Sequence, residues 1–166
     1  MSLEVRIEEL EQELRALRDR ERICNLMADY FAAVDVGWEA ELPDKRERLI
    51  ESVFAADVVV EMITGSGPSV FRGRTALREA YDRDFDAYPF GIHYGSNPRL
   101  TIDGDQADGA WHVFAPCTDP EGVSRWFGGR YLVEFARAPE GWRISRLVQQ
   151  VAFFTAFDRP WSGRAG

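Results

Sequence analysis

Apolar residues near the start of the chain recur at a helical spacing of four, three, four and three positions. They are Leu3, Ile7, Leu10, Leu14 and Leu17. This is the spacing of a heptad seam, and the Glu, Arg and Gln residues between its members favour a helix. The seam covers about two heptads, fewer than the three or four that indicate an independent coiled coil. We therefore expect a helix that lies on its own domain or on a neighbouring subunit, with a free-standing zipper as the alternative.

Helical spacing resumes after this seam. Its apolar positions are Ile23, Leu26, Met27, Tyr30, Phe31 and Val34. Gly37 is placed to end this helix as its C′ residue. A third helix is expected over residues 43–55, because Pro43 suits a first turn and apolar residues follow at helical spacing.

The period then changes from helical to strand-like. Residues 57–63 and 69–72 predict two strands, and residues 74–86 predict a helix after them. Further strands are expected over 91–95, 98–103, 107–116, 125–136 and 142–154. Helices come first and consecutive strands come last, so the order predicts an α+β fold with a mostly antiparallel sheet. Residues 1–155 would form a single domain whose residues 1–20 are a helical extension, and 156–166 would be a tail.

The last predicted strand has no cleanly polar face. One face contains Ile144, Arg146 and Val148, and the other contains Leu147 and Gln149. A half-exposed antiparallel strand should alternate between apolar and polar residues. We therefore expect helices to cover one face and a partner subunit to cover the other, as in a homo-oligomer.

Charge and composition exclude several classes of partner. The 166 residues carry a net charge of −8, which opposes binding to nucleic acid or to an anionic membrane surface. The start of the chain lacks the apolar core of a signal peptide, and the sequence has no run of 18 apolar residues. Cys24 and Cys117 are too few for a disulfide framework. We expect a cytoplasmic protein.

Metal and phosphate chemistry have little support in the sequence. His93 and His112 are the only histidines, and no cluster of His, Cys and carboxylates has metal-ligand spacing. The sequence contains neither a nucleophile-elbow motif nor a phosphate-binding loop. We expect no metal and no cofactor.

Asp35 is the first candidate for acid–base chemistry. It follows an apolar stretch at the end of a predicted helix, where the negative end of the helix dipole disfavours a carboxylate. Such a carboxylate calls for a cationic partner, and His93 could supply one. In that pair Asp35 would orient the imidazole and His93 would move the proton. Alternatively, Asp35 is a solvent-facing helix end and His93 an ordinary strand residue.

Two further residues could serve as acids. Tyr30 could donate a hydrogen bond to an oxyanion, although simple packing would also explain it. His112 could face the same pocket as a second acid, or it could be a hydrogen-bonded sheet residue.

Together these residues resemble a known family. Tyr30 and Asp35 on an early helix, the string His93-Tyr-Gly-Ser-Asn97 and Trp142 in the last strand are similar to the SnoaL-like branch of the nuclear transport factor 2 superfamily. The resemblance covers nearly the whole chain. Characterised members of this branch include bile-acid 7α-dehydratase, hexachlorocyclohexane dehydrochlorinase and scytalone dehydratase.

The resemblance implies a cystatin-like cone, in which helices wrap a curved mixed sheet around a deep apolar pocket. Those enzymes eliminate water or HCl without a cofactor by means of an Asp–His dyad, which Asp35 and His93 match. The relatives are trimers. Pocket walls would include Trp111, Phe114, Tyr94, Met62 and Leu147.

Two positions depart from the relatives. Met62 falls where the bile-acid enzyme has a second pocket tyrosine, and Leu147 falls where the dehydrochlorinase has an arginine. These departures weaken the expectation of a bile-acid substrate and of dehydrohalogenation.

The sequence leaves three functions open. The first is a cofactor-independent lyase or isomerase that acts on an apolar, cyclic small molecule. The second is a binding module that uses the same cavity without turnover. The third is an accessory subunit similar to the small subunit of ring-hydroxylating dioxygenases, because fold alone does not fix function.

Overall fold

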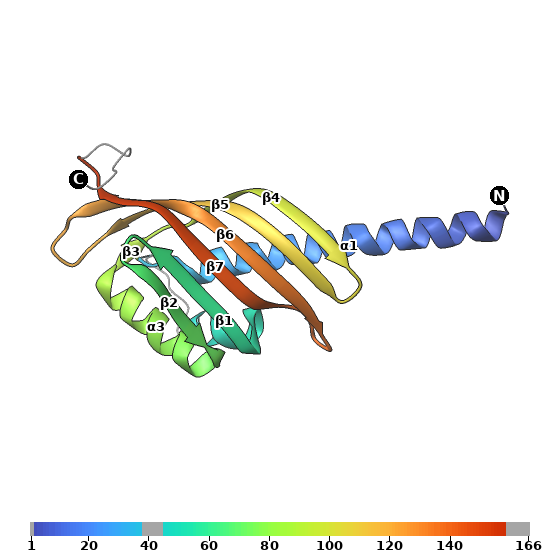
Figure 1. The fold of residues 1–166 in the computed structure, drawn as a ribbon, viewed down its shortest axis with the longest axis horizontal. Coiled ribbons are helices and arrows are strands. Elements are labelled where there is room, and N and C mark those ends of the chain that lie inside the picture. The colour runs from blue at the N-terminus through green and yellow to red at the C-terminus, as the bar shows by residue number, and fades with distance from the viewer. Residues whose placement is uncertain (1, 38–44, 159–166) are drawn as a thin grey trace.

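The computed structural model describes residues 2–37 and 45–158. Its elements run α1 (Leu3–Val34), α2 (Lys45–Arg48), the π-helix η1 (Leu49–Val53), β1 (Phe54–Thr64), β2 (Gly67–Arg72), α3 (Gly73–Ala87), β3 (Phe90–Gly91), β4 (Tyr94–Asp103), β5 (Gln106–Thr118), β6 (Ser124–Ala138) and β7 (Gly141–Ala156). Figure 1 shows α1 crossing behind the sheet, with its first half projecting beyond it.

The strands of the described residues form one open sheet. Its order is β2-β1-β7-β6-β5-β3, and β4 also pairs with β5. β1 runs parallel to β7, and the other pairs are antiparallel. Register shifts interrupt several ladders, two of them between β6 and β7, and bulges of this kind bend a sheet. The prediction of helices on a curved, mixed and mostly antiparallel sheet is confirmed.

The boundaries of most elements agree to within a few residues with those predicted from the sequence. One difference is that the two predicted early helices form a single helix, which Ser2 caps by accepting a hydrogen bond from the Val5 amide. Another is that β1 begins at Phe54, inside the predicted third helix, so that among the described residues of that span 45–53 are helical and 54–55 belong to the strand. Pro43, the predicted start of that helix, lies outside the described residues, as do residues 159–166 of the tail.

Gly37 does not take the predicted C′ position. The C-cap of α1 is Asp35, whose backbone is extended, and Gly37 follows two residues later at a φ of 90°. A side chain at Gly37 would meet the Phe90 ring and the Pro89 carbonyl. The glycine therefore permits the close approach of the segment before β3, which brings that segment beside the end of α1.

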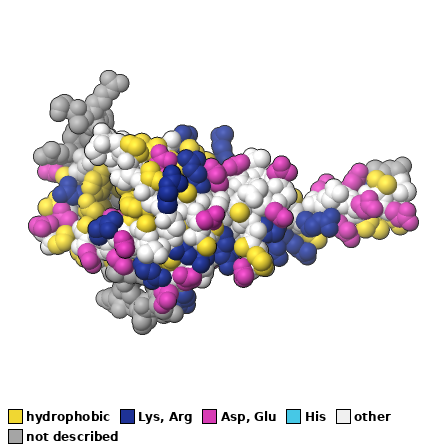
Figure 2. Space-filling model, turned by 60° about the horizontal axis from the view of Figure 1, so that its bottom comes forward, with side chains coloured by type: hydrophobic (Ala, Val, Ile, Leu, Met, Phe, Trp, Pro, Cys, Tyr) yellow, Lys and Arg dark blue, Asp and Glu magenta, His cyan; other side chains and the backbone are white. Residues whose placement is uncertain are grey.

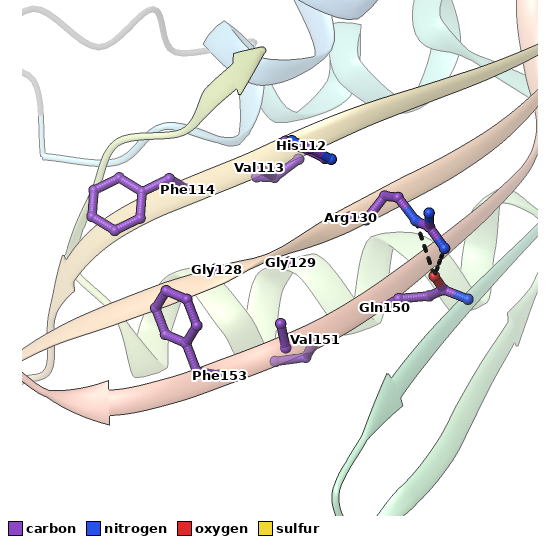
Figure 3. A pocket seen from close by; sticks show the side chains of 10 residues that line it. His112, Val113, Phe114, Gly128, Gly129, Arg130, Gln150, Val151 and Phe153 are labelled. Atoms are coloured by element: carbon purple, nitrogen blue, oxygen red, sulfur yellow. Dashed lines mark hydrogen bonds between the residues drawn. The ribbon is translucent and has the colours of Figure 1, made fainter. Parts of the chain in front are cut away.

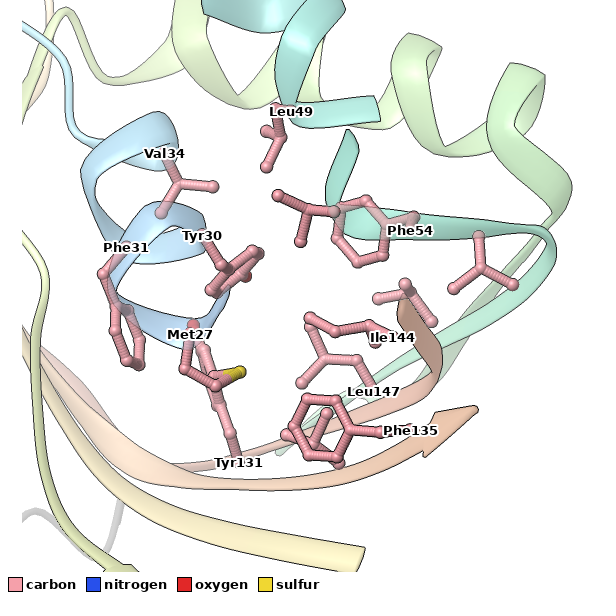
Figure 4. Packing of buried hydrophobic residues seen from close by; sticks show 14 of the residues in the cluster. Met27, Tyr30, Phe31, Val34, Leu49, Phe54, Tyr131, Phe135, Ile144 and Leu147 are labelled. Carbon is pink, nitrogen blue, oxygen red and sulfur yellow. The ribbon is translucent and has the colours of Figure 1, made fainter. Parts of the chain in front are cut away.

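The core lies between the helices and the inner face of the sheet, as Figure 4 shows around Tyr30, Phe54 and Phe135. Rings from α1 and the strands meet edge to face or stacked, for example Phe31 on Tyr131 with centroids 6.1 Å apart. Such ring pairs contribute beyond the area they bury. The packing fixes the second half of α1 against the sheet, and so fixes the position of the helix end.

A partly buried ion pair marks the place where α1 leaves the sheet. Arg137 of β6 holds the Asp19 carboxylate with both terminal nitrogens, at 3.0 and 2.6 Å. The Trp142 indole donates to the same carboxylate at 3.2 Å, and the Arg137 guanidinium lies over the Trp142 ring. These contacts hold the pKa of Asp19 below its ordinary value, chiefly through the hydrogen bond from Arg137.

Candidate functional site

Asp35 is positioned by the end of α1 and by a short bridge to the segment that contains β3. Its amide donates to the Phe31 carbonyl, which completes the last turn of the helix. The next residue, Val36, exchanges two backbone hydrogen bonds with Gly91, at 2.9 and 3.1 Å. This bridge sets the chain after α1 antiparallel to the chain that leads to His93.

The Asp35 carboxylate contacts His93 twice through one oxygen. Asp35 Oδ1 accepts the His93 backbone amide at 2.6 Å and lies 3.1 Å from Nδ1 of the imidazole. The imidazole side chain is 23% exposed and the carboxylate 12%, so the pair is partly buried. The amide contact fixes the oxygen, and the fixed oxygen then orients the ring.

This geometry has a consequence for the histidine tautomer. A carboxylate oxygen only accepts hydrogen bonds, so the Nδ1 contact requires a proton on Nδ1. A neutral His93 then carries its lone pair on Nε2, the form that can take up a proton. Once Nε2 is protonated, the adjacent carboxylate stabilises the imidazolium.

Tyr30 lies in a different set of contacts. Its hydroxyl is 3.2 Å from the Tyr81 hydroxyl and accepts a hydrogen bond from the Gln149 amide at 3.2 Å. Tyr30 is buried, and burial raises its pKa well above the ordinary value. Burial raises the pKa of Tyr81 and of Tyr131 in the same way. The structure thus places Tyr30 within a buried group of neutral hydroxyls, and its role as an acid stays a prediction.

Sequence reasoning missed Tyr81 and Gln149 as partners of Tyr30. Gln149 is buried at a core-facing position of β7. A polar residue on the same face as Leu147 could have signalled a buried hydrogen-bond network. Tyr81 lies on α3, and its sequence neighbours contain no comparable signal.

The structure corrects the prediction for His112. Along β5 the buried side chains Trp111 and Val113 face the helices, and His112 between them is exposed on the opposite, outer face. Its Nδ1 lies 3.4 Å from the Asn97 side-chain nitrogen. Adjacent strand residues point to opposite faces, so His112 cannot share a pocket with the pair at the end of α1.

His112 instead lines a shallow groove of about 600 Å³ on the outer face (Figure 3). The other lining residues are Val113, Phe114, Gly128, Gly129, Arg130, Gln150, Val151, Ala152 and Phe153. Arg130 donates to the Gln150 side chain across its floor. The groove is aromatic at one end and polar at the other.

The five predicted pocket residues are divided between the two faces. Trp111 and Leu147 are buried in the core, and Met62 pairs with Gln149 and is partly buried. Phe114 lines the outer groove, and Tyr94, its partner on β4, is 56% exposed. Phe114 and Tyr94 are therefore wrong as inner pocket walls. An enclosed pocket beside His93 stays a prediction, and residues 38–44, which follow Asp35 closely, lie outside the described residues.

Membrane-spanning helices and metal clusters are both lacking in residues 2–37 and 45–158. None of the helices there combines the length and the hydropathy needed to cross a bilayer. In the same residues, no three His, Cys, Asp or Glu side chains gather as ligands of a metal ion would.

Comparison with known proteins gives a family match over most of the chain. The family model described as the SnoaL-like domain matches residues 15–148. An uncharacterized protein of Mycobacterium tuberculosis, Rv2910c, is 27% identical over 141 residues, which cover 82% of this chain and 88% of the relative.

Solved structures resemble the fold closely. A type 2 hexachlorocyclohexane dehydrochlorinase, LinA, is 26% identical with a TM-score of 0.72, covering 93% of this chain and 99% of its own. A protein of Novosphingobium aromaticivorans described as NTF2-like with a cystatin-like fold is 25% identical with a TM-score of 0.66, covering 86% and 88%.

Proposed function

The chain belongs to the SnoaL-like domain family, and from this premise we propose that it is a cofactor-independent lyase or isomerase whose base is His93. The observation that supports the proposal is the contact of Asp35 Oδ1 with both the amide and the imidazole of His93. A base needs a fixed ring and an available lone pair, and this contact provides for both.

The proposed reaction begins with proton transfer from carbon. His93 Nε2 takes a proton from a carbon next to a carbonyl or ring, or β to a leaving hydroxyl, and the electron pair of the broken C–H bond moves into the substrate. Asp35 stabilises the imidazolium that forms. In an elimination the C–O bond breaks, the leaving hydroxide takes the proton from the His93 imidazolium and departs as water, and neutral His93 is restored; in an isomerisation the imidazolium returns the proton to another carbon. A placed base of this kind contributes about 10²–10⁴-fold in rate.

The proposed substrate is an apolar, cyclic small molecule. Aromatic and aliphatic side chains dominate the inner side of the sheet, where α1 ends. The related dehydrochlorinase is named for hexachlorocyclohexane, itself apolar and cyclic. Leu147, which is fully buried in the core, supplies no charge for a leaving halide. We therefore favour loss of water or a proton shift over loss of chloride.

Solvent deuterium incorporation tests the proposal whichever product forms. A panel of cyclic carbonyl and hydroxy-carbonyl compounds is incubated in D₂O with the protein and analysed by mass spectrometry. We expect at least one compound to exchange or eliminate, and His93→Ala to reduce that rate by about 10²-fold or more.

The control is His112→Ala, which removes the other imidazole from the outer face and should leave the rate within about twofold. Equal rates in wild type and His93→Ala, for every compound that reacts, would refute the proposal. Binding of panel compounds by wild type and His93→Ala alike, without any turnover, would favour the binding-module alternative.

We also propose that the protein is a homo-oligomer in which a second copy covers the outer face of β6 and β7. Support comes from β7, neither face of which is cleanly polar, as expected for a strand that is covered on both sides. Helices cover its inner face, and a second copy on the outer face would cover the other.

A further inference from the structure

The first half of α1 carries an apolar seam that its own domain leaves exposed. Leu3, Ile7, Leu10, Leu14 and Leu17 are between 46% and 76% exposed. The expectation was a helix that lies on its own domain or on a neighbouring subunit, and the first of these is therefore wrong for residues 3–17. Figure 2 shows the projecting helix, with apolar side chains among charged ones.

The seam faces away from the side of α1 that binds the sheet. The buried residues of α1 are Asp19, Ile23, Met27, Tyr30, Phe31 and Val34. At about 100° per residue, their mean direction lies roughly 150° around the helix from that of the seam. A second helix could therefore lie along the seam while each domain stays on the far side of its own helix.

We propose that α1 pairs through residues 3–17 with α1 of a second copy, as a parallel two-stranded coiled coil. The spacing places Ile7 and Leu14 at heptad position a, and Leu3, Leu10 and Leu17 at position d. At Ile7 a β-branched residue at a combines with leucine at d, which favours two parallel strands; Leu14 at the other a position does not add to this preference.

The flanking charges support the parallel arrangement. In a parallel pair with this register, position g of one helix lies near position e of the next heptad on the other helix. Glu13 then meets Arg18 of the second copy, and Arg6 meets Glu11 of the second copy. Arg6 also pairs with Glu9 of its own helix at 3.2 Å, so the Glu13–Arg18 contact is the more informative one. An antiparallel pair aligned on Leu10 and Leu14 would set Glu11 against Glu11 and Glu13 against Glu13.

Two heptads can suffice because the helix is already nucleated. An isolated helix of this length is marginal, since its first turn is costly to form. Here residues 19–34 are held on the sheet by core packing and by the Asp19–Arg137 pair, and 3–18 extend that helix. Pairing therefore orders little additional chain.

Disulfide trapping in the full chain tests both the contact and its direction. Cys24 and Cys117 are replaced by serine, and Leu17→Cys is introduced into that background. A parallel pair brings the two d positions within disulfide reach, so mild oxidation should give a covalent dimer. Gln12→Cys is the matched control, because position 12 lies on the opposite side of the helix and should remain monomeric on a denaturing gel. Equal trapping at positions 12 and 17, or trapping at neither, would overturn the proposal.

A charge exchange tests the interchain pair without changing the seam. Glu13→Lys should raise the dissociation constant of the dimer by about two- to tenfold, since two repelling pairs form per dimer. The double variant Glu13→Lys/Arg18→Glu should restore it. Residues 13 and 18 are five apart and do not face each other within one helix, so rescue reports a contact between chains. Sedimentation equilibrium that shows no rescue, or a wild-type chain that remains monomeric at every concentration, contradicts the proposal.

Discussion

Asp35 Oδ1 combines two tasks in one atom, because it holds the backbone of His93 and also its ring. The sequence predicts this pair from two signals: a carboxylate at the unfavourable end of a helix dipole, and a scarce histidine. The bridge between Val36 and Gly91 that joins them is not readable from the sequence, because it depends on how two loops approach each other.

His112 illustrates a rule that the sequence alone could have applied. Trp111 and His112 are adjacent on a strand, so only one of them can face the helices. The bulky apolar ring of Trp111 takes that side and packs on Phe135 with centroids 6.0 Å apart. The prediction of His112 as a second acid placed it on the wrong face, and its alternative, a hydrogen-bonded sheet residue, agrees with the structure.

At the same scale, Asp19 should make stability depend on pH. We expect Asp19→Asn to lower the free energy of unfolding by about 1–2 kcal/mol at pH 7, because an amide nitrogen would face the Arg137 guanidinium. The pKa of Asp19 is lowered in the folded state. The ionised carboxylate therefore stabilises the fold fully above its unfolded pKa of about 3.9, and this stabilisation is lost as pH falls through the folded pKa.

Urea unfolding of wild type and Asp19→Asn at pH 7 and pH 3 measures this contribution. The gap between the two proteins should shrink at pH 3, because this pH lies below the unfolded pKa of about 3.9, so that unfolding of the wild type takes up a proton at Asp19, whereas asparagine does not titrate. A gap that stays constant or widens would show that the Asp19 charge does not stabilise the fold.

At the scale of elements, the two halves of α1 have different roles. Its second half packs on the sheet and delivers Asp35, and its first half presents the seam. The sequence predicts both apolar patterns but not that one uninterrupted helix contains them. Helix propensity does not stop between residues 18 and 23, and only the contacts of Asp19 show where the helix parts from the sheet.

The contact between α1 and β4 depends on Gly95. The Phe31 ring lies where a side chain at Gly95 would be, two residues from His93. Gly95→Ala should therefore push α1 and β4 apart, lowering the free energy of unfolding by about 1–3 kcal/mol and reducing turnover through misplacement of His93. Gly65→Ala is the control, since no atom lies within 4 Å of the added carbon. Chemical denaturation measures both variants; equal stability of the two would contradict the close packing.

At the scale of the whole molecule, the order of elements in the sequence predicts helices on a mostly antiparallel sheet. The parallel pair of β1 and β7 cannot be predicted from local pattern, because its paired residues lie about 90 positions apart in the sequence and no tight turn joins the two strands. Likewise, the mixed faces of β7 predict that both sides are covered, but they do not identify what would cover the outer side.

The proposed outer interface can be tested separately from pairing through α1. In a Leu10→Lys background, which places a charge in the seam, sedimentation velocity should still show an oligomer. Ala152→Arg, in the middle of the groove, should shift that species to the monomer. Asp103→Arg, at the exposed last residue of β4, should not. A Leu10→Lys protein that is already monomeric would contradict a second copy on the outer face.

The central claim is that Asp35 orients the His93 imidazole and holds its proton on Nδ1 before any substrate binds, which leaves Nε2 free to act as a base. ¹⁵N NMR of the imidazole nitrogens in the ligand-free protein tests this claim most directly. The chain has two histidines, so His112→Ala assigns the spectrum. We predict that neutral His93 carries its proton on Nδ1, and that Asp35→Asn removes this preference. A neutral His93 protonated on Nε2, or one whose tautomer is unchanged in Asp35→Asn, would contradict the account.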